Sequence, residues 1–72
     1  MEIYRSYLTN SNNDILAFET HSNFNKMIED YNSLKANNFF SQFNDYDKIF
    51  ISTKGPLEKP YTDKLYEISI IN

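Results

Sequence analysis

The sequence predicts a small α+β domain in which two β-hairpins flank one helix, and two observations lead to that prediction. Four segments combine β-forming residues with the alternation of side chains that is typical of strands, at residues 2–9, 14–20, 47–53 and 64–71. Between the second and third segments, residues 23–37 repeat their apolar side chains at helical spacing. The element order is therefore ββαββ, in a single domain that spans residues 1–72.

The first two segments form a predicted hairpin. Residues 2–9 (EIYRSYLT) are apolar on both faces, which suits a strand in the middle of a sheet. The turn formers NSNN at 10–13 join them to the second segment, DILAFET. In that second strand we expect Leu16 and Phe18 to face the core.

The helix is predicted from five apolar positions in the i, i+3, i+4, i+7 pattern, namely Phe24, Met27, Ile28, Tyr31 and Leu34. Ser22 is the expected N-cap, because a serine hydroxyl can accept a hydrogen bond from the first helical turn. The pair Asn37–Asn38 can end the helix, since asparagine tolerates the left-handed backbone of a C-cap.

The second hairpin pairs DKIFIST (47–53) with KLYEISII (64–71), and the ten residues between them hold the single glycine and both prolines. We favour the sheet order 2-1-4-3, with strands 1 and 4 central and parallel and the helix across one face. This arrangement is similar to the β-grasp fold in element order and size. Another four-stranded α+β order is the alternative. The predicted frame consists of Ile3, Leu16, Phe18, Phe24, Met27, Ile28, Tyr31, Leu34, Ile49, Ile51, Ile68 and Ile70.

Composition narrows the class of protein. The chain has 72 residues, no cysteine and a net charge of −3, which argues against disulfides, a thiolate metal site and a phosphate-binding role. No charged-then-apolar leader opens the chain, and no apolar run approaches the length of a membrane span, so we expect a cytoplasmic protein. Half of the residues are Asn, Ile, Lys, Tyr or Phe, whose codons are rich in A and T. This bias suggests a phage or mobile-element origin.

Residues that could carry chemistry are few. His21 lies two positions from Glu19 and could begin a metal site with Asp14, but a strand-end surface histidine is the simpler interpretation. Asp45 and Asp47 resemble the start of an EF-hand loop, yet its glycine and its final glutamate are missing. With a lone glycine and no marked nucleophile, the sequence predicts a non-enzymatic protein without metal or cofactor.

Aromatic and acidic residues instead predict a surface that binds another protein. One helix cannot cover both faces of the sheet, and Tyr and Phe are enriched at interface hot spots. The predicted partner-binding residues are Phe39, Phe40, Phe43, Asp45, Tyr46, Asp47 and Tyr61, the last within a predicted binding loop at 54–61.

The phenylalanines of NNFFSQF leave two arrangements open. Either the chain bends at the asparagine pair and these rings close the core, or the helix continues and exposes them.

We expect an inhibitor or modulator of a host protein, with mimicry of nucleic acid as one version of that role. The alternatives are a homo-oligomer, for example a homodimer, and a binder of single-stranded nucleic acid through stacked rings. Nucleic acid is the less favoured partner, because few basic residues accompany the tyrosines.

Overall fold

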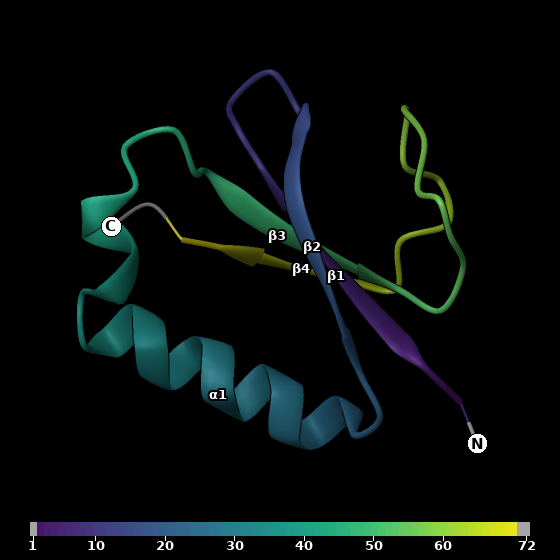
Figure 1. Cartoon of the computed structure of the whole chain (residues 1–72), viewed down its shortest axis with the longest axis horizontal. Coiled ribbons are helices and arrows are strands. Elements are labelled where there is room, and N and C mark those ends of the chain that lie inside the picture. Colours follow the sequence, from purple (N-terminus) through teal and green to yellow (C-terminus); the bar gives the residue numbers. More distant parts are fainter. Residues whose placement is uncertain (1, 71–72) are drawn as a thin grey trace.

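The computed structural model describes residues 2–70, and within them a four-stranded sheet packs against one long helix (Figure 1). The predicted α+β class and the order ββαββ are confirmed. No helix within residues 2–70 has the length and apolarity needed to cross a membrane. The elements are β1 (Tyr4–Thr9), β2 (Ile15–His21), α1 (Phe24–Ala36), the short 3₁₀ helix η1 (Phe39–Gln42), β3 (Lys48–Ser52) and β4 (Tyr66–Ser69). Ile71, the end of the last predicted strand, lies outside the described residues.

The strand order is β2-β1-β3-β4 with every neighbouring pair antiparallel, so the favoured order 2-1-4-3 is wrong and the alternative four-stranded order holds. The reason lies in the two faces of each strand. In β3, Ile49 and Ile51 fill one face and Phe50 fills the other, and all three are nearly inaccessible to solvent. In β4, Ile68 is buried but its neighbour Glu67 is exposed, which suits an edge.

Helix α1 begins and ends at asparagines. Asn23, not the predicted Ser22, is the N-cap, and its side-chain oxygen accepts a hydrogen bond of 3.0 Å from the Lys26 backbone N–H. At the other end Asn38 adopts the left-handed conformation with φ 59°, as expected for a residue that turns the chain out of a helix. The chain bends here and continues as η1.

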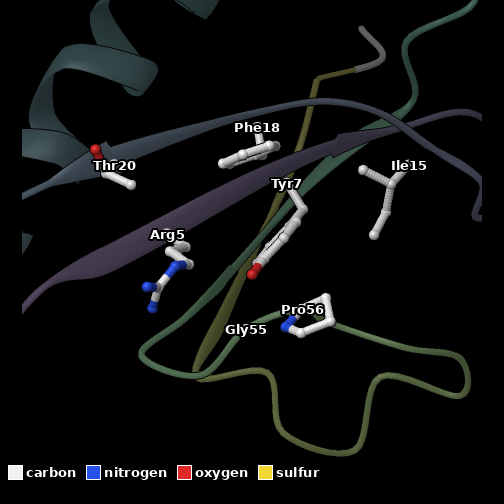
Figure 2. A pocket seen from close by; sticks show the side chains of 7 residues that line it. All are labelled: Arg5, Tyr7, Ile15, Phe18, Thr20, Gly55 and Pro56. Carbon is white, nitrogen blue, oxygen red and sulfur yellow. The ribbon is translucent and has the colours of Figure 1, made fainter.

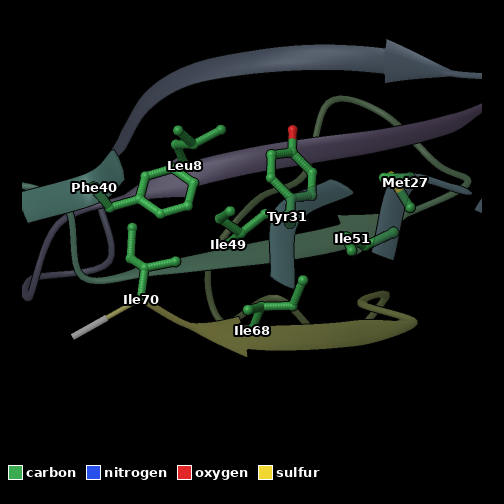
Figure 3. Close-up of a cluster of buried hydrophobic side chains, with 8 residues drawn as sticks. All are labelled: Leu8, Met27, Tyr31, Phe40, Ile49, Ile51, Ile68 and Ile70. Atoms are coloured by element: carbon green, nitrogen blue, oxygen red, sulfur yellow. The ribbon is translucent and has the colours of Figure 1, made fainter. Parts of the chain in front are cut away.

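The main core lies between α1 and one face of the sheet (Figure 3). Met27 and Tyr31 point from the helix onto the isoleucines of β3 and β4, which confirms these members of the predicted frame. Phe24, Ile28 and Leu34 pack at its margin. The buried members of this core are Leu8, Met27, Tyr31, Phe40, Ile49, Ile51, Ile68 and Ile70.

The opposite face carries a second, smaller core beneath the loop of residues 53–65, which Figure 1 shows on the side of the sheet away from α1. Leu57 and Tyr61 of this loop bury Tyr7 of β1 and Phe50 of β3. The rings of Phe50 and Tyr61 lie 4.8 Å apart between centroids. The sheet is thus covered on both faces at β1 and β3, where we expected an open face.

Strand β2 presents the reverse of its predicted faces. Ala17 packs toward the main core, whereas Leu16 and Phe18 are exposed, as is Ile3 before β1, so these three do not belong to the frame. The register shifts by one residue opposite Leu8 and Thr9, and Ile15 takes the place beside Thr9 that regular alternation would give to Leu16. Ile15 consequently shares a face with Phe18.

Candidate partner-binding surface

A groove runs between β2 and the loop 53–65 on the face away from α1 (Figure 2). Its volume is about 510 Å³, and five of its lining residues come from the first hairpin and two from the loop. Arg5 and Ile15 lie at opposite ends, with Tyr7 and Phe18 between them. The lining residues are Arg5, Tyr7, Ile15, Phe18, Thr20, Gly55 and Pro56.

The floor of the groove is fixed by a close approach of the loop to β1. The Tyr7 hydroxyl donates a hydrogen bond of 3.1 Å to the Lys54 carbonyl. A Cβ atom on Gly55 would lie 2.9 Å from the Tyr7 oxygen and 3.0 Å from Cδ of Arg5. A larger residue at position 55 would therefore displace the Tyr7 hydroxyl or the Arg5 side chain, and glycine lets the loop approach β1 without that shift.

The far end of the loop is tied to the turn of the first hairpin. The Lys59 ammonium lies 2.7 Å from the Asp14 carboxylate and also donates to the Asn12 carbonyl at 2.9 Å. The Lys59 hydrogen bond holds the pKa of Asp14 below its usual value, and Asp14 in turn raises the pKa of Lys59. The Tyr61 hydroxyl donates to the Asn13 carbonyl. The loop forms one wall of the groove because it is held at both ends.

The outer side of the groove is apolar and exposed. Phe18 has 62% of its surface accessible, and its ring centroid lies 6.2 Å from that of Tyr7 with 29° between the ring planes. Beyond β2 no strand pairs within residues 2–70, so the backbone of its outer edge is open. The first hairpin therefore offers an exposed ring beside an unpaired strand edge.

Arg5 is the single arginine of the chain and the only charged side chain of the groove. One terminal nitrogen lies 3.4 Å from the Thr53 carbonyl. No carboxylate within residues 2–70 forms an ion pair with it, although the chain carries ten acidic residues. The groove therefore combines an apolar floor with a positive charge at one end.

The three predicted phenylalanines divide between core and surface. Phe40 is only 6% exposed and packs with Tyr31 in the main core, so it is not available to a partner. Phe39 and Phe43 are 40% and 36% exposed. Phe43 stacks on Tyr46 with 5.0 Å between ring centroids. The helix does not continue: the chain bends at the asparagine pair, and η1 turns one ring into the core and leaves two at the surface.

The structure also places the remaining predicted site residues in different parts of the molecule. Asp45, Tyr46 and Asp47 line a polar hollow of about 420 Å³ against the turn 10–12, and Asp47 is paired with Lys48 at 3.5 Å. Tyr61 is 5% exposed and belongs to the second core, far from the role expected of it. The aromatic and acidic residues around position 43 thus form one surface, but without Phe40 and Tyr61.

His21 belongs to a polar cluster at the edge of the main core. Its Nε2 lies 3.3 Å from both the Ser6 and the Tyr31 hydroxyls and 3.7 Å from Oε2 of Glu19. The Tyr31 hydroxyl donates to Glu19 at 3.1 Å and lies 2.6 Å from Ser6. Burial raises the pKa of Tyr31 to about 12.

This cluster has no geometry for nucleophilic catalysis. The carboxylate and the serine approach the same imidazole nitrogen, whereas a triad needs them on opposite nitrogens, and Ser6 is fully buried. No group of three or more metal-ligating side chains occurs within residues 2–70, and Asp14 is engaged by Lys59 instead of lying beside His21.

Sequence reasoning missed Arg5 and Phe18 as surface residues, whereas Pro56 belongs to the predicted binding loop 54–61. One signal was present: Arg5 and Tyr7 stand two positions apart on a predicted strand and hence on one face. Comparison with family models, with curated proteins and with solved structures gave no match.

Proposed function

We propose that this chain is a small protein-binding module that modulates a host protein, and that its binding surface is the groove along β2. The observation that supports this proposal is the exposure of Phe18, an aromatic ring 62% accessible on the outermost strand of the sheet. Exposed apolar strand edges pair readily with other chains, and natural proteins normally protect them with lysine or proline. Strand β2 (ILAFETH) contains neither.

Strand addition is the binding mode that fits this edge. A partner segment in extended conformation would pair with the backbone of β2, while its alternate side chains enter the groove. The register shift near Leu16 leaves residues 17–21 as the regular stretch available for pairing. The opposite edge, β4, has four residues against the seven of β2, and this shorter length makes it the poorer template.

A second copy of the chain is the second candidate partner. An antiparallel pair of β2 strands related by a two-fold axis would place the two Phe18 rings opposite each other. We do not propose single-stranded nucleic acid, because the two rings that a stacking platform would need on this face, Tyr7 and Tyr61, are buried.

The proposal is tested by placing a photo-crosslinking phenylalanine analogue at position 18. Position 65 is the matched control, because Leu65 is 57% exposed but lies outside the groove. Position 43 tests the second candidate surface, which is formed by Phe39, Phe43 and Tyr46. We expect position 18 to crosslink a host protein in cells, and the purified complex to protect the amides of residues 17–21 from hydrogen exchange. Crosslinks from position 43 alone would place the binding surface at the end of η1, around Phe43, instead of at the groove. A dimeric mass in solution with crosslinks only between copies would favour the homo-oligomer.

A further inference from the structure

The groove also carries information about the sequence of the segment that would occupy it. We infer that it selects an extended segment with an acidic side chain followed two residues later by an apolar side chain. This inference rests on the proposed strand addition to β2 and concerns which partner sequence that strand accepts. Three features support it: the level of each groove residue along the strands, the size of Thr20, and the charge of Arg5.

The pairing of β1 with β2 fixes the position of each groove residue along the strands. Tyr7 is paired with Phe18, and Arg5 with Thr20, so these two pairs form consecutive rows across the groove face. Same-face residues of a strand are two positions apart. An added strand therefore presents one side chain beside Phe18 and another beside Thr20. Its intervening side chain points to the opposite face, toward the side of α1.

The row of Phe18 favours an apolar side chain. Its ring is supported on the inner side by Tyr7 and open on the outer side. Covering that exposed apolar surface is the main gain available in this row. Pro56 and Ile15 extend the apolar lining around it. An aromatic or branched aliphatic side chain would fill the space.

The row of Thr20 favours a carboxylate. Threonine is the smallest side chain on this face of β2, so a long acidic side chain on an added strand can pass over it toward Arg5 on β1. The guanidinium makes one hydrogen bond of 3.4 Å and has no carboxylate partner within residues 2–70. A charge-assisted bond to a carboxylate is about twice as strong as a neutral one.

Antiparallel addition fixes the order of the two side chains. Every pair in this sheet is antiparallel, and antiparallel pairing is slightly the more stable arrangement. An antiparallel strand meets Thr20 before Phe18, so the partner reads acid-x-apolar in its own N-to-C direction. A second copy of β2 would pair Leu16 with Thr20 in the symmetric register and leave Arg5 without an acid. The charge of the groove thus favours a different protein over a second copy.

The test uses capped eight-residue peptides of alternating threonine and valine, with acetylated and amidated ends. The set carries Glu-x-Phe, Lys-x-Phe, Glu-x-Ser or the reversed order Phe-x-Glu, and binding is measured by fluorescence polarisation up to millimolar protein. We expect Glu-x-Phe to bind about tenfold more tightly than Lys-x-Phe, since a hydrogen bond between charged groups contributes about 1.5 kcal/mol or more. Glu-x-Ser and Phe-x-Glu should bind more weakly than Glu-x-Phe.

Two variants of Arg5 identify the residue that reads the charge. Arg5→Glu should reverse the preference to Lys-x-Phe, and Arg5→Gln, which keeps most of the stem that packs on Gly55, should abolish it. Lys26→Glu is the control, because it changes net charge by the same amount on α1, at the other side of the sheet. The Lys26→Glu variant should keep the preference of the wild type for Glu-x-Phe over Lys-x-Phe.

The outcomes separate this inference from the proposed function. Peptides that bind with equal affinity whatever their charge would support strand addition and overturn the acidic preference. Binding of Phe-x-Glu as tight as that of Glu-x-Phe, or tighter, would overturn the acid-x-apolar order. Absence of binding by every peptide at millimolar concentration would overturn strand addition itself.

Discussion

The two faces of the sheet are covered by different means, and the difference explains where a partner can bind. On one face α1 supplies a continuous apolar stripe, and the main core extends over β1, β3 and β4. On the other face a loop supplies two large side chains, Leu57 and Tyr61, which cover only β1 and β3. Strand β2 therefore remains uncovered on the loop side.

The comparison teaches that a loop covers a sheet locally, whereas a helix covers it along its length. Apolar residues recur along α1 at every turn, so its stripe continues across the sheet. The loop 53–65 has no such repeat and buries only the residues that its anchors bring within reach. The space beside its anchored wall becomes a groove because nothing within residues 2–70 fills it.

The largest expected effect separates core from surface within a single dipeptide. Phe40→Ala should lower the free energy of unfolding by about 3–5 kcal/mol, as for other buried phenylalanines. Phe39→Ala, at a ring that is 40% exposed, should cost much less. Urea denaturation measures both, and Phe40→Leu, expected to lose about 1.5 kcal/mol or less, serves if the alanine variant does not fold. Equal losses at positions 39 and 40 would contradict the inward turn made by η1.

Much of the helix side of this comparison could be predicted from the sequence. Periodicity alone places Met27 and Tyr31 in the core, because helical spacing admits one apolar stripe. The choice between Phe39 and Phe40 could not be made, since it depends on the left-handed turn at Asn38 and the tight turn that follows. A sequence shows that such a turn is allowed but does not fix its direction.

Little of the structure on the face of the sheet that the loop 53–65 covers could be predicted from the sequence. Two-sided apolarity predicts a central place for residues 2–9, and the same property of KIFIS indicates a central place for β3 beside them. In β2, a one-residue register shift brings Ile15 onto the face of Phe18, and this shift leaves no trace in the sequence pattern. Arg5 becomes part of a site only when the loop reaches it.

The second-largest predicted effect is the pH dependence of stability that arises from Tyr31, on the face of the sheet that α1 covers. Burial raises the pKa of Tyr31 from 10.0 to about 12. Below pH 10 both folded and unfolded chains keep the proton. Between pH 10 and 12 the unfolded chain releases it while the folded chain holds it, so the free energy of unfolding falls by at most about 2–3 kcal/mol.

Tyr31→Phe isolates this contribution from the other tyrosines. The variant should begin less stable by about 1 kcal/mol, because its hydrogen bonds to Ser6 and Glu19 are lost. The difference in free energy of unfolding between this variant and the wild type should then shrink as pH rises above 10. Urea denaturation at pH 8 to 11 measures this difference, and a difference that stays constant would show that Tyr31 is not held neutral by burial.

The smallest effect should be found where the loop is tied to the first hairpin. Asp14 and Lys59 are solvent-exposed, so Asp14→Asn should leave the midpoint of unfolding nearly unchanged. It should instead speed hydrogen exchange at the Tyr61 amide, which bonds to the Glu58 carbonyl within the loop. Because the Lys59 hydrogen bond lowers the pKa of Asp14 below its ordinary value of 3.8, the ion pair contributes fully above that ordinary value and is lost as pH falls through the lower pKa of the folded chain.

Asp30→Asn is the matched control for the loop, because it removes a comparable exposed ion pair with Lys26 on α1. It should leave exchange at Tyr61 as in the wild type. If Asp14→Asn also leaves that exchange unchanged, the Tyr61 hydroxyl and the second core hold the loop without help from the Asp14–Lys59 ion pair. The wall of the groove would then be as firmly placed as the helix on the other face, and the contrast between the two faces would be one of extent alone.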